Sequence, residues 1–305
     1  MCSPAIRNSA LNDAIIETTI KSLPLLQRGK VRDVYAVGTD HLLMIATDRL
    51  SAFDVVLPEP LAGKGKILTQ VALFWFDQMK ELVPNHLSSE LTLEEVLPNA
   101  QEYAQAKDRS MLVKRLKPLP VEAVVRGYLI GSGWKDYQSN GSVCGVELPA
   151  NMELAEQIEP SIFTPATKAD VGDHDINISF DEMTKIIGTD YANAVKDISQ
   201  TIYQRASIYC KKRGIILADT KFEFGLDANS QLTLMDEILT PDSSRFWNAA
   251  SYRQGENPES YDKQFVRDYL ETLDWNKKAP GPTLPEDIKA RTLGRYEEAL
   301  RVLTS

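Results

Sequence analysis

The first third of the chain carries the residue pattern of paired strands followed by one helix. Strand-forming residues fill 28–38 and 41–57, with a Gly-Thr-Asp turn signal at their junction. Apolar side chains recur near helical spacing over 66–83, and Pro84 is expected to end that helix. This region is therefore predicted to be a group of strands with one helix.

The pattern changes near residue 117. A short strand is predicted at 110–116, and a Lys-Pro-Leu-Pro segment then interrupts it. Residues 121–130 are again typical of a strand, 131–138 begin a short helix, and 145–178 are predicted to be mostly loop. A chain of 305 residues can form two ordinary domains, and we expect a boundary between two lobes at the Pro-rich interruption.

The last part of the chain is predicted to be helical around one pair of strands. Ser179 followed by Glu182 is typical of a capping box that begins a helix. A long helix is predicted over 190–213, and two further helices are predicted near 259–273 and 285–303.

Residues 215–226 and 232–239 are predicted to form an antiparallel hairpin. Alternate side chains of a strand point to opposite faces, so the first strand has one charged face. That face carries Asp219, Lys221 and Glu223. If the turn is centred at residue 229 or 230, Glu223 is predicted to lie opposite Asp236 on the same face.

The opposed carboxylates indicate a cation site. Two facing carboxylates repel each other unless a positive charge lies between them. Mg²⁺ takes oxygen ligands and bridges carboxylates to phosphates, while Lys221 can neutralise the acids or contact a phosphate itself. The alternative interpretation is a surface ladder of ion pairs. The acids at Asp236-Glu237 and the polar turn that ends in Arg245 favour the metal, although a register change of one residue would turn Asp236 to the other face.

The net charge of the chain limits the classes of partner that it can bind. The formal net charge is -9 and the pI is about 5.0, and a field of this sign repels nucleic acid and anionic membranes. No window is apolar enough over the length of a membrane span, and the N-terminus lacks the pattern of a signal peptide. Three scattered cysteines are typical of a reducing compartment, which predicts a cytoplasmic protein, and three separated histidines form no zinc motif.

An anionic substrate must then be bound by local basic groups, of which the first lies at 28–32. Gly29 lets backbone approach a ligand, and Lys30 and Arg32 would share one strand face, which suits nucleotide phosphates. The segment matches no Walker or Rossmann motif. The alternative interpretation is a basic, solvated edge strand.

A second basic group combines Arg126 with Ser132. A guanidinium and a hydroxyl beside Gly131 and Gly133, at a predicted helix N-terminus, favour an anion. The alternative interpretation is that Arg126 pairs with a carboxylate such as Glu122.

A third candidate group lies in the predicted loop. It contains Lys168, His174, Asp175 and Asn177, and polar loop residues on a rigid scaffold are often functional. The alternative interpretation is that Asp175 and Asn177 satisfy the backbone of turns. No nucleophile elbow or Cys–His pair stands out in the sequence.

Taken in order, seven segments resemble the phosphoribosylaminoimidazole-succinocarboxamide synthase (SAICAR synthase) family, from about residue 25 to the C-terminal helices. The segments are RGKVRDVY, ATDRLSAFD, LPVEAVVRGYLIGSGWKDY, FTPATKADVGDHDINIS, LADTKFEFG, MDEILTPDSSRFW and SYDKQFVRDYL. LPVEAVVR with the Gly-Ser that follows, and LADTKFEFG, are the most specific. In one departure, Ile130 stands where the family often has Thr or Ala.

The resemblance implies an α+β fold with two lobes. A kinase-like, antiparallel-sheet lobe at 1–117 would bind nucleotide, a second α+β lobe at 118–305 would bind substrate and metal, and ATP would lie in the cleft between them. The implied activity is an ATP-dependent ligase of de novo purine biosynthesis. It joins carboxyaminoimidazole ribotide (CAIR) to L-aspartate and gives SAICAR, ADP and phosphate. Mg²⁺ is the implied cofactor, ATP is a co-substrate, and the expected assembly is a monomer.

The resemblance also implies roles for individual residues. The ATP-binding residues would be Gly29, Lys30, Arg32, Lys114, Leu116 and Glu122. The substrate-binding residues would be Arg126, Ser132, Lys168, His174, Arg245 and Lys263. The catalytic residues would be Lys221, Asp219 and Asp175, with Glu223 and Asp236 as the metal ligands.

The chemistry of such a ligase agrees with these residue types. A carboxylate is a poor acyl donor, and phosphorylation by ATP would give an acyl phosphate that the amine of aspartate attacks. This transfer needs cations on the phosphates and in-line positioning more than it needs a protein nucleophile. Asp219 is expected to orient Lys221 or to support a metal ligand.

Two other functions share part of the pattern. A kinase acting on a small molecule would need the same metal carboxylates, but it would not need three anion-binding groups or aspartate. A non-catalytic nucleotide sensor would not need to keep the acidic pair together with Lys221.

Overall fold

The computed structural model of this chain describes residues 14–168 and 175–305, which form two compact units. The first unit contains residues up to 73, 86–115 and 263–301, and the second contains 74–85, 116–262 and 302–305.

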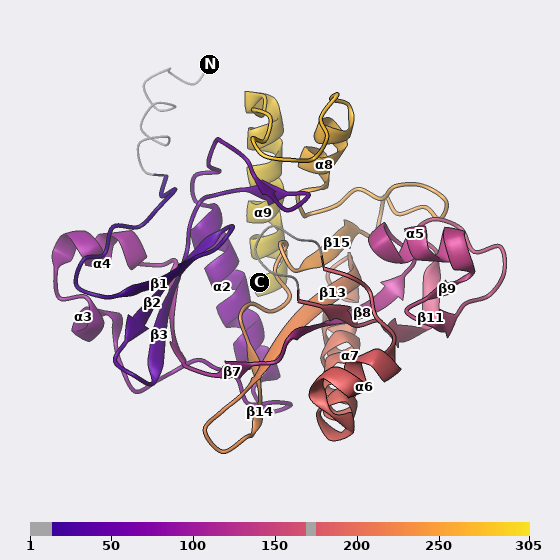
Figure 1. The fold of residues 1–305 in the computed structure, drawn as a ribbon. Helices are drawn as coiled ribbons and strands as arrows, with labels where there is room; N and C mark the ends of the chain where they lie inside the picture. Colours follow the sequence, from indigo (N-terminus) through magenta and orange to yellow (C-terminus); the bar gives the residue numbers. More distant parts are fainter. Residues whose placement is uncertain (1–13, 169–174) are drawn as a thin grey trace. The chain divides into compact units, whose positions relative to one another are not determined.

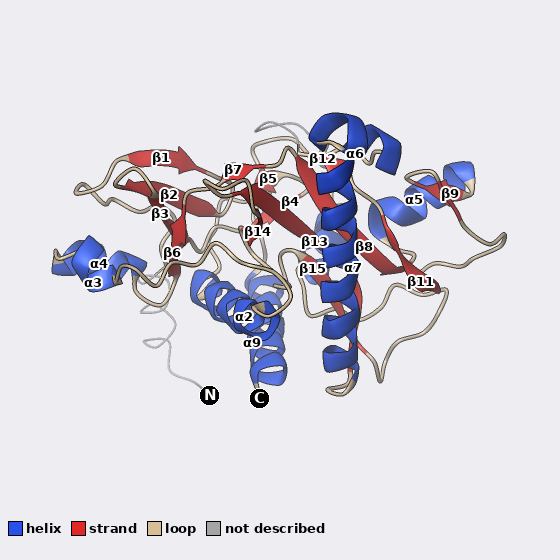
Figure 2. Cartoon of the chain, turned by 90° about the horizontal axis from the view of Figure 1, so that it is seen from below, coloured by secondary structure: helices blue, strands red, loops and turns tan. Residues whose placement is uncertain are grey.

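The first unit is built on a four-stranded antiparallel sheet in the order β1-β2-β3-β6. Figure 1 labels β1, β2 and β3, and Figure 2 also labels β6. Its strands are β1 (Leu25–Arg28), β2 (Arg32–Val37), β3 (His41–Ala46) and β6 (Ser110–Lys114). Tyr35 faces Leu43 in the β2–β3 register, and both side chains are buried with Ile20 and Ile45 in one apolar cluster. The predicted strands on either side of residues 38–40 are thereby confirmed.

The other elements of the first unit are short strands and helices. They are β4 (Ser51–Ala52), β5 (Val55–Val56), α3 (Leu93–Val96), α4 (Ala100–Ala106) and α8 (Gln264–Glu271). Helices α2 (Lys64–Met79) and α9 (Glu286–Thr304) contribute residues to both units. These helices confirm the helical patterns near 66–83, 259–273 and 285–303, although α2 ends before Pro84.

The second unit is built on a seven-stranded sheet in which β13 (Ile215–Leu226) is the longest strand. The path β11-β8-β13-β14 is extended by β12 on β8 and by β7 and β15 on β13. The further strands of this sheet are β7 (Lys117–Pro118), β8 (Val121–Tyr128), β11 (Gln157–Phe163), β12 (Ala166–Thr167), β14 (Leu232–Met235) and β15 (Ser244–Asn248). β13 therefore has neighbours on both of its edges.

Helices cover this sheet. α7 (Thr189–Lys211) lies across β13 and β8, as Figure 2 shows, and its buried residues Val195, Ile202 and Ala206 recur at helical spacing. α6 (Phe180–Ile187) precedes it and begins with the predicted capping box, because Ser179 and Glu182 each accept a hydrogen bond from the other's backbone N–H. α5 (Gly131–Asn140) and the hairpin of β9 (Ser142–Val143) and β10 (Val146–Glu147) complete the unit.

The strand β11 was not predicted. Most described residues of 145–178 lie outside strands and helices, as expected, but β11 occupies seven of them and pairs with β8. Pro160 interrupts the alternating pattern within this strand. Proline is tolerated at a sheet edge, where an N–H is not needed, and β11 is such an edge with an irregular register between Gln157 and Ile162.

The fold is thus mixed α/β with antiparallel strand pairing in the sheets of both units. In the part of the chain that the structure describes, every helix is too short or too polar to cross a bilayer.

Candidate active site

The centre of β13 gathers the charged residues that the sequence singles out. Its backbone register places Asp219 opposite Arg126 of β8 on one side and opposite Arg245 of β15 on the other. Residues from three separate segments are therefore brought to one point by strand pairing alone. The register between β13 and β15 shifts at an irregularity between Leu217 and Asp219.

Asp219 binds two guanidiniums, which we call the guanidinium pair (Arg126 and Arg245). Arg126 Nη1 lies 3.4 Å from Asp219 Oδ2, and Arg245 Nη1 donates to the same oxygen. Arg126 is buried, and it also donates to Thr164 Oγ1 and to Ser132 Oγ, each at 2.9 Å. The alternative pairing of Arg126 with Glu122 is wrong, because its carboxylate partner is Asp219.

The guanidinium pair retains one positive charge after Asp219 is counted, and it lies beside the start of α5. A Cβ at Gly131, where φ is +62°, would lie 2.5 Å from Arg245 Nη2. A Cβ at Gly133 would lie 3.0 Å from Arg126 Cδ. These glycines let the helix N-terminus approach both guanidiniums, which is an arrangement suited to an anion. Ile130 is the N-cap residue before this helix, where its side chain makes no capping hydrogen bond, and it packs in an apolar cluster with Trp247.

Lys221 is bound by a buried carboxylate, although not by the one expected. Its Nζ lies 2.6 Å from Glu122 Oε1, so Glu122 and not Asp219 orients it. Burial raises the pKa of Glu122 to about 7, against the lowering effect of Lys221. Burial disfavours the charged form of Lys221, yet Glu122 beside it raises the lysine pKa above its usual range.

Glu223 lies beside a lysine and a second carboxylate. Lys168 Nζ donates a hydrogen bond to Glu223 Oε2. Burial and then the charge of Asp236 raise the pKa of Glu223, while Lys168 lowers it. Two acids that repel in this way favour a cation between them.

The predicted register of this pair is wrong by one residue. Glu223 faces Met235, because Leu226 pairs with Leu232 and the turn is centred on residue 229. Asp227 holds this turn by accepting hydrogen bonds from the N–H groups of residues 229 and 231, each at 2.8 Å. Asp236 follows the end of β14 with φ of 68°, so strand alternation no longer decides its direction, and its charge still acts on Glu223.

The donor set fits Mg²⁺. Glu223 and Asp236 supply only oxygen, which is the ligand type that Mg²⁺ prefers, and two carboxylates leave positions for water and phosphate. Among the described residues, no group of three or more His, Cys, Asp or Glu side chains gathers as a complete metal site. A site completed by phosphate oxygens agrees with that finding.

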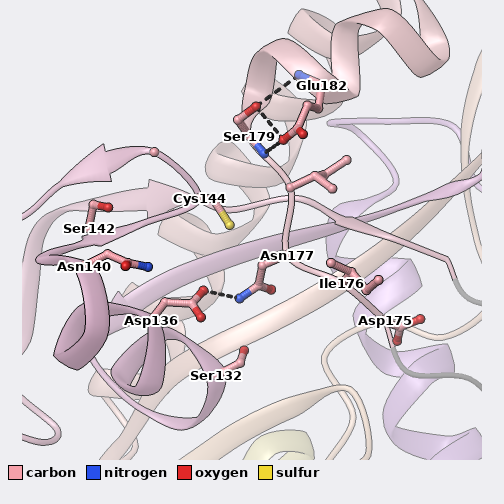
Figure 3. A pocket seen from close by; sticks show the side chains of 12 residues that line it. Ser132, Asp136, Asn140, Ser142, Cys144, Asp175, Ile176, Asn177, Ser179 and Glu182 are labelled. Carbon is pink, nitrogen blue, oxygen red and sulfur yellow. Dashed lines mark hydrogen bonds between the residues drawn. The ribbon is translucent and has the colours of Figure 1, made fainter.

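A cavity of about 560 Å³ lies within the second unit (Figure 3), and it is lined in part by Ser132, which accepts a hydrogen bond from Arg126. Ser132, Asp136 and Asn140 line it from one face of α5, and Asn177 Nδ2 donates to Asp136 Oδ2 at 2.6 Å. Asp175 also lines it, and its charge raises the pKa values of Glu122 and Lys221. Asp136 was missed by the sequence reasoning, although the i, i+4, i+8 spacing of these polar residues on α5 is a signal that could have identified it.

The basic segment 28–32 belongs to the first unit and forms a turn. Residues 29–31 connect β1 to β2, and Gly29 N–H donates to Arg32 O at 2.7 Å. The prediction that Lys30 and Arg32 share a strand face is therefore wrong, because Lys30 lies in the turn. Lys30 Nζ lies 2.5 Å from Asp54 Oδ1, and both side chains are partly exposed.

The other predicted site residues that the structure describes belong to other parts of the two units. Lys114 is exposed at the end of β6 and donates its backbone N–H to His86 O at 2.7 Å, and Leu116 lies two residues further. Lys263 precedes α8 in the first unit. His174 lies outside the described residues.

Comparisons with known proteins agree with the resemblance in the sequence. A family model described as SAICAR synthetase matches residues 25–282. The phosphoribosylaminoimidazole-succinocarboxamide synthase of Thioalkalivibrio sulfidiphilus is 56% identical over 294 residues, which are 96% of this chain and 99% of that protein. The structure is similar to that of the SAICAR synthase from Saccharomyces cerevisiae complexed with SAICAR, with a TM-score of 0.87, 41% identity, and coverage of 95% of this chain and 98% of that chain. It is also similar to a SAICAR synthetase in complex with ADP, with a TM-score of 0.68, 25% identity, and coverage of 91% and 97%.

Proposed function

This chain belongs to the SAICAR synthetase family, and we propose that it joins L-aspartate to CAIR with cleavage of ATP to ADP and phosphate. The reaction belongs to de novo purine biosynthesis. The family match extends over most of the chain, and the 56% identity extends over nearly all of it. A cytoplasmic, monomeric enzyme remains our expectation.

One structural observation supports this function most directly, the set of charged groups along β13. Within five residues, this strand presents Asp219 with the guanidinium pair, Lys221 with Glu122, and Glu223 with Lys168. A ligase that handles several anionic substrates needs such separate positive groups beside acids that hold a cation.

The guanidinium pair is the proposed site of the ribotide phosphate. Arg126 and Arg245 supply the charge, while Ser132 Oγ and the N-terminus of α5 supply hydrogen-bond donors. Asp219 keeps both guanidiniums aimed at this position. Lys168 and Asp175 are proposed to lie near the imidazole and aspartate groups, and Lys263 is proposed as a further phosphate contact.

Glu223 and Asp236 are the proposed Mg²⁺ ligands. Mg²⁺ would supply positive charge to the phosphates of ATP when bound. Lys221 donates hydrogen bonds to a phosphate oxygen from the position that Glu122 gives it. Its raised pKa keeps it charged throughout the neutral range.

The nucleotide is proposed to contact both lobes of a kinase-like arrangement, 1–117 and 118–305. Gly29, Lys30 and Arg32 would hold the phosphates. Lys114 to Leu116 would contact adenine mainly through backbone, and Glu122 would act near the nucleotide through Lys221.

The proposed chemistry has two steps. A carboxylate oxygen of CAIR attacks the γ-phosphorus, and the bond to the β,γ-bridging oxygen breaks to release ADP. The amine of aspartate then attacks the acyl carbon, loses a proton, and displaces inorganic phosphate. Neither step needs a protein nucleophile, which agrees with a site made of Lys, Arg, Asp and Glu.

A coupled assay tests this function. The protein is incubated with ATP, Mg²⁺ and CAIR, with and without L-aspartate, and SAICAR absorbance and ADP are both followed. We expect one ADP per SAICAR and little turnover without aspartate. ADP release that ignores aspartate and forms no SAICAR would instead identify a kinase.

A further inference from the structure

The segment Thr47-Asp48-Arg49 of the first unit has no role in the proposed reaction, although it belongs to the conspicuous run ATDRLSAFD. Arg49 is buried, with 6% of its surface exposed, and its guanidinium is aimed at the turn between β1 and β2. A buried guanidinium normally pairs with carboxylates, whereas this one is directed mainly at backbone.

Arg49 binds three carbonyl oxygens of that turn. Its Nε donates to Lys30 O at 3.0 Å, and its Nη2 donates to Gly29 O at 2.8 Å and to Arg32 O at 3.2 Å. Nη1 donates to Ile16 O, and Asp33 Oδ1 lies 2.9 Å from Nη2.

Thr47 binds the remaining carbonyl of the turn. Both its backbone N–H and its Oγ1 donate to Val31 O at 2.9 Å. All four carbonyls from residue 29 to residue 32 are therefore held by Thr47 and Arg49. Loops are usually the mobile parts of a fold, so hydrogen bonds to every carbonyl of this connection are an unusual feature.

The direction of these carbonyls decides the direction of the amides. In a planar trans peptide, the N–H of one residue points away from the C=O of the residue before it. Because the carbonyls of Gly29 and Lys30 point at Arg49, the N–H groups of Lys30 and Val31 point away from it. Successive amides that point the same way form an anion-binding concavity.

We propose that Arg49, assisted by Thr47, is a positioning residue that turns the 29–32 connection into an amide-lined cradle for nucleotide phosphates. This inference rests on the proposed binding of ATP phosphates at Gly29, Lys30 and Arg32. Arg49 acts through the backbone and does not itself contact the nucleotide. The fully buried carboxylate of Asp33 balances the charge of Arg49. Thr18 holds this carboxylate, because its backbone N–H and its Oγ1 donate to Asp33 Oδ2 at 2.8 Å and 2.7 Å.

The first test is Arg49→Lys, with Arg109→Lys as a matched control. Lysine keeps the charge but lacks the planar fork that spans three carbonyls. Arg109 is also buried in the same unit, and its guanidinium pairs with Asp48 at 3.0 Å. We expect both variants to lose thermal stability. Only Arg49→Lys should raise the KM for ATP, by about tenfold, with kcat and the KM values for CAIR and aspartate within about twofold of wild type.

A second pair of variants keeps the test decisive if Arg49→Lys does not fold. Thr47→Val removes the hydroxyl bond to Val31 O, and Thr47→Ser retains it. We expect Thr47→Val to raise the KM for ATP about threefold and Thr47→Ser to restore it. The inference is overturned if Thr47→Val has the same KM for ATP as Thr47→Ser and if Arg49→Lys, where it folds, has the same KM for ATP as Arg109→Lys.

Hydrogen exchange separates failure of this inference from failure of the proposed function. Peptides covering residues 25–35 are followed by mass spectrometry with and without ADP. Protection by ADP in the wild type supports nucleotide binding at the connection, and its loss in Arg49→Lys but not in Arg109→Lys supports the inference. If ADP protects wild type and Arg49→Lys equally, only the inference fails. If ADP does not protect the wild type, the proposed contact of the nucleotide with the 29–32 connection is wrong, and the inference about Arg49 falls with it.

Discussion

The two proposed anion sites, one in each unit, are of different kinds. At the 29–32 connection, the proposed donors are backbone amides, and the guanidinium of Arg49 that binds the carbonyls of this turn is buried. At β13, the donors are side chains, and each is already paired with an opposite charge, as Lys221 is with Glu122.

The difference predicts unequal tolerance to substitution. A site built from amides keeps its donors when a side chain at its rim changes. A site built from buried ion pairs leaves one charge uncompensated when its partner is removed, which commonly costs several kcal/mol. Substitutions on β13 should therefore have larger effects than those at the tip of the β1–β2 connection.

The largest effect is expected for Glu223→Gln. The amide keeps the volume of the side chain but removes the negative charge that a cation needs, and it leaves Lys168 without its carboxylate. We expect kcat to fall by about a thousandfold, the upper range for removing one group that stabilises charge in a transition state. Steady-state rates over a Mg²⁺ titration measure this, with Glu147→Gln on an exposed strand as the control. A rate within tenfold of wild type would remove Glu223 from the metal assignment.

The next largest effect is expected for Arg126→Lys. Lysine keeps the charge but cannot contact Asp219, Thr164 and Ser132 together. We expect kcat/KM for CAIR to fall about a hundredfold, because buried charged hydrogen bonds contribute roughly 1.5–3 kcal/mol each. The KM for ATP serves as the internal control and should change less than twofold. An equal change in both constants would mean that the variant disturbs the whole unit.

A smaller effect is expected for Lys30→Ala. Lys30 is a partly exposed point charge paired with Asp54, and exposed pairs contribute about 0–1 kcal/mol. We expect the KM for ATP to rise about fivefold at most, with kcat nearly unchanged. A loss as large as that of Arg126→Lys would break the comparison between the two sites.

The last effect is a change in the pH dependence of stability, measured as a slope and not as a rate, for Glu122→Gln. The pKa of Glu122 is raised to about 7, so between pH 4.5 and 7 the native protein keeps a proton that the unfolded chain has released. Stability from this group is therefore present at low pH and is lost as pH rises through about 7. The slope is at most about 1.4 kcal/mol per pH unit.

Urea denaturation of wild type and Glu122→Gln from pH 5 to pH 8 measures this slope. The free energy of unfolding of wild type should fall more steeply with pH than that of the variant. Parallel curves would show that Glu122 titrates near its ordinary pKa.

Much of the second unit could be predicted from sequence because local patterns decide it. The alternation in 215–226 predicted β13 to the residue, and the Ser179–Glu182 capping box began α6 as expected. The register of the hairpin could not be predicted, since it depends on how Asp227 closes the turn. The edge strand β11 was hidden by Pro160.

The pairing of strands that are far apart in the chain could not be predicted from the sequence, for a different reason. Alternation tells which side chains share a face, but it does not tell which strand lies beside β13. The prediction that Asp219 orients Lys221 is therefore wrong, because β8 places Arg126 beside Asp219 and Glu122 beside Lys221. The proposed role of Arg49 could not be predicted either, because every residue has a backbone carbonyl and the sequence does not indicate which carbonyls accept its hydrogen bonds.

The sequence separation of these contacts has a consequence for how the molecule assembles. Arg126 and Asp219 are 93 residues apart, and Glu122 and Lys221 are 99 apart. Contacts that close such long loops form late, because chain entropy opposes them until other structure has brought the ends together. The acidic and basic groups thus meet only when β8 docks on β13, and pulse-labelled exchange during refolding should protect both strands in one phase.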